Sequence, residues 1–200
     1  LIILVVTLPI QAKECTYTTY AWNVNSKSAT NYHEVKHNYK DIQDFERDKF
    51  SGCTVCEEDQ IELKLPHIPP FKVCRYKAAD IEQALISAMR QGKYIESVVA
   101  YRVGLTRGDT DAHGNRTRFS NHSFGIALDI NEKHNGLYEG CQEFSSQCRL
   151  RKGGPWQRDN PKSLQAFDPV VLNLKAVGFK WGGEIEGWQK DFMHFSPTGY

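Results

Sequence analysis

Two histidines and two aspartates in separate parts of the chain are of the types that build a catalytic metal centre. His122 and Asp129 lie within residues 120–131, and Asp191 and His194 lie near the C-terminus. Two imidazoles and one carboxylate can hold a zinc ion and leave a coordination position for water, while a second carboxylate serves as general base. The four residues therefore predict a hydrolytic metal centre, if the two segments meet in space.

The local sequence predicts that strands carry these groups. In residues 126–131 isoleucine and leucine alternate with smaller or polar residues, and Asp129 belongs to the second set. Residues 192–195 repeat this alternation more weakly, with His194 between apolar neighbours. Because side chains alternate between the two faces of a strand, both segments should direct a metal ligand away from the core.

These motifs resemble those of the VanY-type zinc D-alanyl-D-alanine carboxypeptidases, a family in the Hedgehog/DD-peptidase superfamily of peptidoglycan-cutting enzymes. The shared pattern is Ser-x-His-x-x-Gly-x-Ala-x-Asp from Ser120, then Trp-Gly-Gly from Trp181 and Asp-x-x-His-Phe from Asp191. The resemblance covers roughly residues 71–200. Many relatives follow Trp-Gly-Gly with an acidic residue and a tryptophan, whereas here Glu-Ile-Glu-Gly precedes Trp188. The shape of the substrate pocket is therefore expected to differ from theirs.

The resemblance implies a role for each motif residue. His122, Asp129 and His194 would bind one zinc ion. Asp191 would accept a proton from the attacking water and pass it to the leaving amine, as general base and then general acid. Arg102 would contact the substrate and stabilise the oxyanion that forms during the reaction.

Further substrate contacts are expected from Ser120 and Trp181, which stand at fixed positions of the motifs. The polar segment after residue 103 also carries three arginines, at positions 107, 116 and 118. These could bind a substrate carboxylate or simply face solvent.

The implied activity is hydrolysis of a peptide bond in peptidoglycan stem peptides, with the D-alanyl-D-alanine terminus as the preferred bond. Two alternatives stay open: an endopeptidase of the same family, and a non-catalytic cell-wall-binding module that keeps the fold. Asp191 beside a full ligand set favours an enzyme, because a binding module has no need of a general base.

The chain has an ordinary globular composition and a short apolar beginning. Of its 200 residues 40% are hydrophobic and 24% are charged, which suffices for a core. The net charge of +1 gives no reason to expect a nucleic acid or an anionic membrane as partner. The apolar run of residues 1–10 is about half the ~20 residues that a membrane span needs. It favours a secretory signal that ends near Ala12, with a buried first strand as the alternative.

These features divide the chain into three parts. Residues 1–12 are interpreted as a signal peptide truncated at its front, residues 13–70 as a cysteine-bearing N-terminal extension, and residues 71–200 as the zinc peptidase domain. The protein is expected to be secreted or periplasmic. Its oligomeric state does not follow from the sequence, and a monomer is assumed.

Six cysteines in an exported chain predict disulfide bonds. Cys141 and Cys148 enclose a short segment and are the pair expected first. The remaining cysteines allow three connectivities, among which the sequence does not choose; they are Cys15, Cys53, Cys56 and Cys74. The Cys53-Thr-Val-Cys56 motif could instead be half of a structural zinc site or a redox motif.

The expected fold class is α+β, with a small antiparallel sheet and helices packed on one side, as in the Hedgehog/DD-peptidase superfamily. Helices are predicted over 78–92, where apolar residues recur on one face, and over 168–178, which begins with Asp-Pro and ends with Gly. The segments 97–102 and 179–181 are predicted strands, and 104–119 is a predicted loop.

A second possible zinc motif occurs in the N-terminal extension. His33-Glu-Val-Lys-His37 fits His-Glu-x-x-His, in which two histidines one helical turn apart bind zinc. The spacing of a helix face is found at Tyr32, Val35, Tyr39 and Ile42, so a helix is expected here. The motif is short, its surroundings are polar and no third ligand follows, so we interpret this helix as a solvated face.

Overall fold

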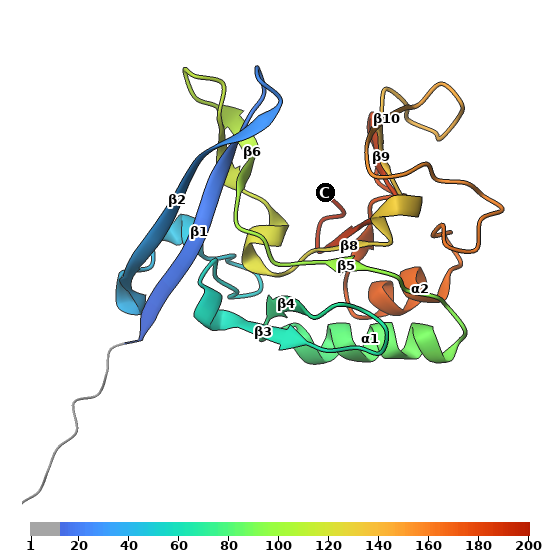
Figure 1. Ribbon diagram of the computed structural model, residues 1–200, viewed down its shortest axis with the longest axis horizontal. Helices are drawn as coiled ribbons and strands as arrows, with labels where there is room; N and C mark the ends of the chain where they lie inside the picture. Colours follow the sequence, from blue (N-terminus) through green and yellow to red (C-terminus); the bar gives the residue numbers. More distant parts are fainter. Residues whose placement is uncertain (1–12) are drawn as a thin grey trace, which may run out of the picture.

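The chain forms a base from which two arms of β-strands rise side by side (Figure 1). The computed structural model describes residues 13–200, so the predicted signal segment lies outside the described residues. Two helices, α1 (Ala78–Arg90) and α2 (Pro169–Ala176), lie along the bottom of the base. None of the helices in the described range is long and apolar enough to cross a membrane.

The base contains a four-stranded antiparallel sheet that lies above the helices. Its strands, in the order β11-β13-β8-β5, are β11 (Lys180–Trp181), β13 (His194–Ser196), β8 (Leu128–Ile130) and β5 (Val98–Val99). Asp129 is opposite His194 on one side and opposite Val99 on the other. This register therefore brings two of the predicted metal ligands together.

Local sequence explains both helices. Ile81, Leu85 and Ala88 are fully buried on one face of α1, and the chain leaves the helix at Gly92, whose φ of 85° suits glycine. At the start of α2 the Asp168 side chain accepts a hydrogen bond from the backbone of Val170 at 2.9 Å. The predicted helices are thus confirmed, with ends that differ by a residue or two.

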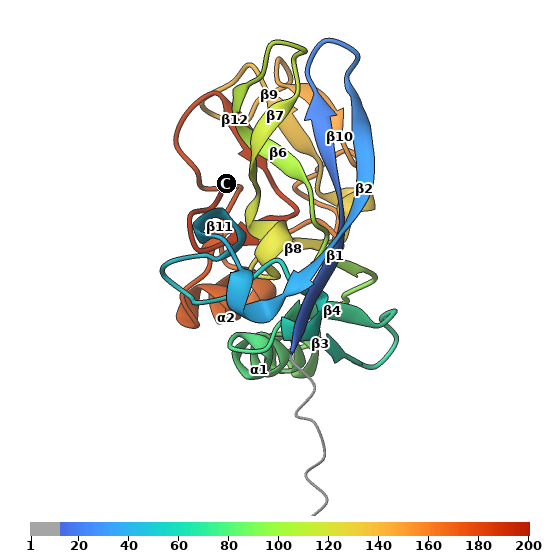
Figure 2. The ribbon, with the colours of Figure 1, turned by 90° about the vertical axis from the view of Figure 1, so that its left-hand side faces the viewer.

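One arm contains a four-stranded sheet that joins the N-terminal extension to the rest of the protein (Figure 2). Its order is β2-β1-β6-β7, with β1 (Glu14–Asn23), β2 (Ser28–Asn38), β6 (Leu105–Thr110) and β7 (Arg116–Phe119). The link between the two hairpins is a parallel bridge at Ala21 and Leu105.

Two predictions are wrong in this arm. The segment 104–119 is not a loop, because it folds into the β6–β7 hairpin. Its side chains are largely exposed and polar, so no hydrophobic alternation marked the strands. The expected helix around residues 32–42 is absent too, because residues 28–38 pair with β1 as strand β2. Cross-strand hydrogen bonds outweighed the weak helical spacing of four apolar residues.

The other arm is a three-stranded sheet, and a small hairpin completes the base. The arm has the order β10-β9-β12, with β9 (Leu137–Glu139), β10 (Arg149–Lys152) and β12 (Gln189–Asp191). The hairpin is β3 (Gln60–Leu63) with β4 (Phe71–Cys74). Short 3-10 helices are found at Tyr39–Asp41, Asp44–Glu46, Glu57–Asp59, Asn121–Phe124 and Glu132–His134.

The described residues form three disulfides. Cys141–Cys148 is confirmed, and the other four cysteines pair as Cys15–Cys56 and Cys53–Cys74. Cys53 and Cys56 therefore serve neither as zinc ligands nor as a redox pair. The Cys53–Cys74 bond ties the N-terminal extension to the end of β4.

The structure is an α+β fold, as expected. One element is shorter than predicted: only Val98 and Val99 of segment 97–102 form a strand, and Arg102 follows in irregular backbone. Residues on both sides of position 70, among them Leu63, Phe71 and Leu85, pack into one hydrophobic core.

Candidate metal centre

His122, Asp129 and His194 converge where the base sheet faces the space between the arms. The Oδ1 atom of Asp129 lies 3.1 Å from His122 Nε2 and 2.9 Å from His194 Nδ1. Each residue offers one ligand atom within 4.8 Å of the other two. All three side chains are buried, with 3–4% of each residue exposed. The structure thus brings together side chains from two segments that lie far apart in the sequence.

His122 is oriented by its short helix and by a backbone acceptor. Its ring Nδ1 hydrogen-bonds to the carbonyl of Ala100 at 2.7 Å, so Nδ1 carries the proton and Nε2 is left to face Asp129. The helix ends at Gly125, where φ is 66° and an added Cβ would lie 2.5 Å from the backbone nitrogen of Cys74. Only glycine permits this close packing, which explains the glycine three positions after the histidine.

The charges of the cluster suit a divalent cation. Burial alone would raise the pKa of Asp129, but His122 and His194 hold it well below its ordinary value. Burial lowers the pKa of His122, with the Asp129 charge opposing this effect. An ionised carboxylate beside a neutral imidazole is the state in which these groups bind metal. His194 Nε2 is buried and has no hydrogen-bond partner among the described residues. The donor set of two nitrogens and one carboxylate oxygen fits zinc.

Asp191 is held next to this cluster by Gly182. The Gly182 amide donates to the carbonyl of His194 at 2.8 Å, and the Asp191 amide donates to the carbonyl of Gly182 at 3.0 Å. The Oδ1 atom of Asp191 is buried and has no partner within residues 13–200. Burial raises the pKa of Asp191 to about 6; Asp129 adds to the effect, while His194, Lys152 and Arg107 oppose it. A carboxyl with a pKa close to neutrality is suited to exchange protons during catalysis.

Cations surround the second oxygen of Asp129. Its Oδ2 atom is 3.1 Å from Arg102 Nη2 and 3.9 Å from Lys152 Nζ. Although burial opposes the charge of Arg102, Asp129 and Tyr20 raise its pKa above the ordinary value. Sequence reasoning missed Lys152, because β10 lies in a different arm and carries no motif. Arg107 is close enough to Asp191 for their charges to interact.

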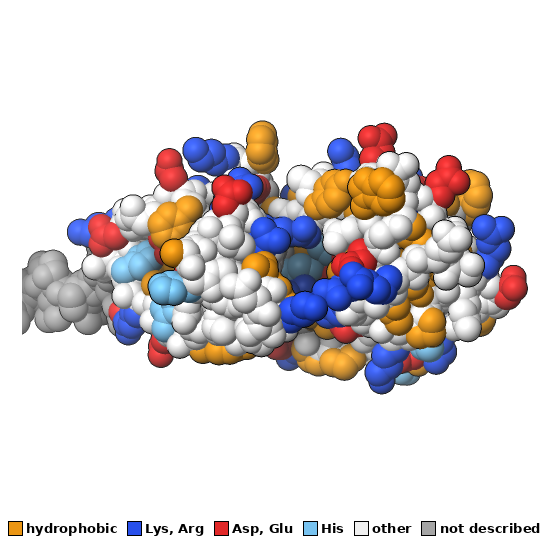
Figure 3. All heavy atoms as spheres, turned by 90° about the horizontal axis from the view of Figure 1, so that it is seen from above, with side chains coloured by type: hydrophobic (Ala, Val, Ile, Leu, Met, Phe, Trp, Pro, Cys, Tyr) orange, Lys and Arg blue, Asp and Glu red, His pale blue; other side chains and the backbone are white. Residues whose placement is uncertain are grey.

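These basic residues belong to an open hollow. Seen from above, the molecule is hollowed between its two arms, with Lys and Arg side chains along the rim and a histidine at the floor (Figure 3). A molecule that enters from this side meets positive charge before it reaches the candidate metal centre. Anionic groups are therefore favoured at the rim.

The two other predicted substrate residues are buried. Ser120 is 7% exposed and precedes the short helix that carries His122, and its carbonyl accepts a hydrogen bond from Ser123 at 2.9 Å. Trp181 is 4% exposed, and its Nε1 donates to the carbonyl of Phe192 at 2.8 Å. Both residues support the backbone around the cluster, and their contact with substrate stays a prediction.

The His-Glu-x-x-His motif does not form a zincin site. His33 and His37 lie on strand β2, where a separation of four residues spans about 13 Å, whereas zinc binding requires one helical turn. Among the described residues the other close group of possible ligands is Cys15, Cys56 and Glu58. Its cysteines are bonded to each other, so they cannot bind a metal.

Comparison with known families agrees with this geometry. Residues 113–197 match the model of the family described as D-alanyl-D-alanine carboxypeptidase. The matched segment contains His122, Asp129, Asp191 and His194, and it confirms the resemblance to the VanY-type peptidases that the motifs indicated. No curated protein and no solved structure matches the chain, so the likeness to the Hedgehog/DD-peptidase fold remains a prediction.

Proposed function

We propose that the protein is a zinc metallopeptidase that hydrolyses a peptide bond in the stem peptides of peptidoglycan, with the terminal D-alanyl-D-alanine bond preferred. The observation that carries this proposal is the convergence of His122, Asp129 and His194 beside the shielded carboxyl of Asp191. The match to a peptidase family over residues 113–197 supports it.

His122, Asp129 and His194 would hold the zinc ion. When bound, zinc polarises a carbonyl and makes a water molecule acidic enough to attack at neutral pH. The Oδ1 atom of Asp191 accepts the proton of the attacking water and then delivers it to the departing amine. A raised pKa helps the second step, because a carboxyl that ionises near neutral pH both takes up and releases a proton readily.

The cations near the cluster can stabilise charge that develops during the reaction and can attract an anionic substrate. Arg102 lies beside Asp129, where its positive charge would stabilise the negative charge that develops on the substrate carbonyl. Arg107 and Lys152 interact with the same carboxylates from the two arms. A substrate with a free C-terminal carboxylate would complement this positive rim. This argument favours a carboxypeptidase over an endopeptidase, whose substrate lacks that charge at the cleaved bond.

Three disulfides in the described chain support function in an oxidising compartment. Together with a substrate in the cell wall, they favour secretion or a periplasmic location.

The decisive experiment combines metal analysis with mass spectrometry of products. Purified muropeptides would be incubated with the wild-type protein, with Asp191→Asn and with Asp159→Asn, a control at an exposed aspartate. We expect the wild type and the control to release a single alanine. Asp191→Asn should keep one equivalent of zinc but lose turnover by about 10²–10⁴-fold, which is the usual contribution of general acid–base catalysis.

Other results would change the proposal. Two peptide fragments in place of released alanine would identify an endopeptidase. Unchanged muropeptides with all three proteins, despite bound zinc, would indicate a binding module. Equal turnover by the wild type and Asp191→Asn would remove Asp191 from the mechanism.

A further inference from the structure

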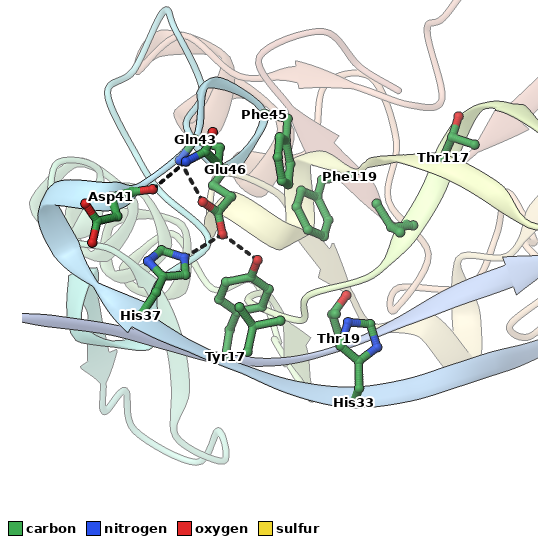
Figure 4. A pocket seen from close by; sticks show the side chains of 12 residues that line it. Tyr17, Thr19, His33, His37, Asp41, Gln43, Phe45, Glu46, Thr117 and Phe119 are labelled. Atoms are coloured by element: carbon green, nitrogen blue, oxygen red, sulfur yellow. Dashed lines mark hydrogen bonds and ion pairs between the residues drawn. The ribbon is translucent and has the colours of Figure 1, made fainter.

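A second pocket lies on the arm that the N-terminal extension builds, between the β-sheet and the turn that follows β2 (Figure 4). Its volume is about 650 Å³, within the ~300–1,000 Å³ of typical ligand sites. Tyr17 and Thr19 of β1 line this pocket, whereas Thr18 and Tyr20 line a smaller pocket together with Arg102. Because alternate side chains of a strand point to opposite faces, the larger pocket and Arg102 lie on opposite sides of β1.

One wall of the pocket is aromatic and open to solvent. Phe45 is 63% exposed, and its ring lies nearly parallel to that of Phe119, with centroids 6.1 Å apart and an angle of 27°. Tyr17 meets Phe119 edge to face at 6.1 Å. An exposed phenyl ring that packs on Phe119, which Tyr17 supports in turn, offers a flat apolar surface for a ligand ring.

The floor of the pocket is a closed network that holds this wall in place. Glu46 is 2% exposed and accepts hydrogen bonds from the Tyr17 hydroxyl at 2.5 Å, from His37 at 2.9 Å and from the backbone N–H of Gln43 at 2.7 Å. The other ring nitrogen of His37 bonds to the carbonyl of Asn38 at 3.0 Å. The charges of His37 and Glu46 thus satisfy each other, and neither group is left for a charged ligand.

The opposite end of the pocket presents unsatisfied polar groups. Thr19 is 3% exposed, and its Oγ1 has no hydrogen-bond partner among the residues that the structure describes. Its cross-strand neighbour is His33, and the two side chains lie together in Figure 4. His33 Nδ1 hydrogen-bonds to the carbonyl of Asn31 at 2.8 Å, so Nε2 of the neutral ring is free to accept a hydrogen bond.

We propose that this pocket binds a sugar ring. A sugar has an apolar C–H face, which can stack on Phe45, and a rim of hydroxyls, which can bond to Thr19 and His33. A purely apolar ligand would leave the Thr19 hydroxyl without a partner. An anion would find the positive charge of His37 already paired with Glu46. The class of ligand follows from the pocket itself, while the choice of a peptidoglycan glycan strand rests on the proposed function.

A glycan site here would assist the peptidase reaction. Phe119 lines the pocket, and three positions further the same segment carries His122. Phe119 also contacts Phe124, which ends the short helix of His122, with ring centroids 6.2 Å apart. A glycan held in the pocket would keep the enzyme on the polymer while stem peptides reach the hollow on the other side of the arm.

The test is titration calorimetry of the full chain with glycan oligosaccharides freed of peptide and, separately, with the free stem pentapeptide. We expect the oligosaccharides to bind with and without chelator, because the pocket needs no metal. Phe45→Ala should weaken this binding about tenfold. Phe50→Ala, which removes a fully exposed ring outside the pocket, should leave binding unchanged.

Thr19→Val is the more specific variant. It keeps the shape of the side chain and removes a buried hydroxyl that has no partner within residues 13–200, so the melting temperature should not fall. Binding of the oligosaccharide should weaken about threefold to tenfold, which corresponds to one lost hydrogen bond.

Three outcomes would overturn the proposal: no binding of glycan by the wild type, equal losses for Phe45→Ala and Phe50→Ala, or binding of the pentapeptide alone that Phe45→Ala abolishes. Hydrolysis of the pentapeptide is a separate measurement. Glycan binding without hydrolysis would refute the proposed function and leave the sugar site standing, and hydrolysis without glycan binding would do the reverse.

Discussion

The variant Gly182→Ala should displace Asp191 without changing the binding of metal. A Cβ at residue 182 would lie 2.3 Å from the carbonyl oxygen of Asp191, whereas an ordinary contact begins at 3.4 Å. The backbone of Asp191 must therefore move by about 1 Å, since the neighbouring atom is not part of a flexible side chain. His122 and Asp129 lie on other segments, and His194 is held by the pairing of β13 with β8, so the three candidate ligands should stay in place.

A displacement of this size in a catalytic group lowers the rate by about 10²-fold, or roughly 2.7 kcal/mol of transition-state stabilisation. We expect kcat on a stem pentapeptide to fall by this factor while the zinc content of the purified protein is unchanged. The assays are steady-state kinetics for kcat and KM, elemental analysis for zinc, and thermal unfolding for stability.

Gly92→Ala is the matched control. Gly92 lies at the end of α1 with φ of 85°, and nothing lies within 4 Å of an added Cβ, so this variant introduces backbone strain without a steric clash. It should lower the melting temperature and keep kcat. The reasoning is refuted if Gly182→Ala retains wild-type kcat, or if it loses zinc in proportion to its loss of activity.

Four further outcomes follow from the structure. Asp129→Asn should weaken zinc binding about 100-fold or more in equilibrium dialysis, because it removes the charge that both imidazoles face. The control Asp159→Asn should bind zinc like the wild type. Chelation of the metal should lower the melting temperature of the wild type but not that of Asp129→Asn, since a ligand of the folded state stabilises it. The value of kcat/KM should decline as the pH falls through about 6, where Asp191 takes up a proton. A bound cation would move the midpoint of this decline to a lower pH. A flat profile down to pH 4 would contradict the assignment of Asp191 as base. Burial opposes the ionisation of Glu46, but hydrogen bonds from Gln43, Tyr17 and His37 hold its pKa below the ordinary value. Ionised Glu46 therefore stabilises the fold at pH values above its unfolded pKa of ~4.3. Urea unfolding should accordingly show Glu46→Gln less stable than the wild type by ~1–3 kcal/mol at pH 6, with the difference shrinking as the pH falls below 4.

Sequence reasoning succeeded where the signal is local. The helices around residues 78–90 and 169–176 carry their own periodicity and end signals, and Cys141 and Cys148 are close because the segment between them is short. The four residues of the candidate centre could be named in advance, because strand alternation separates the polar ligand from its apolar neighbours. The motif spacing also sufficed to recognise a peptidase family.

Sequence reasoning failed where strands are polar. The β6–β7 hairpin and strand β2 are polar and exposed, so neither has the apolar periodicity that marks a strand. Their conformation is decided by backbone pairing, of β2 with β1 and of β6 with β7, and a single bridge joins β6 to β1.

Residue types and their short-range spacing thus determined which side chains can bind a metal, where the helices begin and end, and which family the second half of the chain resembles. The tertiary structure alone decided that Lys152 and Gly182 lie beside the metal-binding cluster, which cysteines of the extension pair, and that Thr19, His33 and Phe45 share a pocket. The physical reason is that these arrangements depend on hydrogen bonds and packing between different segments of the chain, and the local pattern of one segment does not indicate which other segment it will contact.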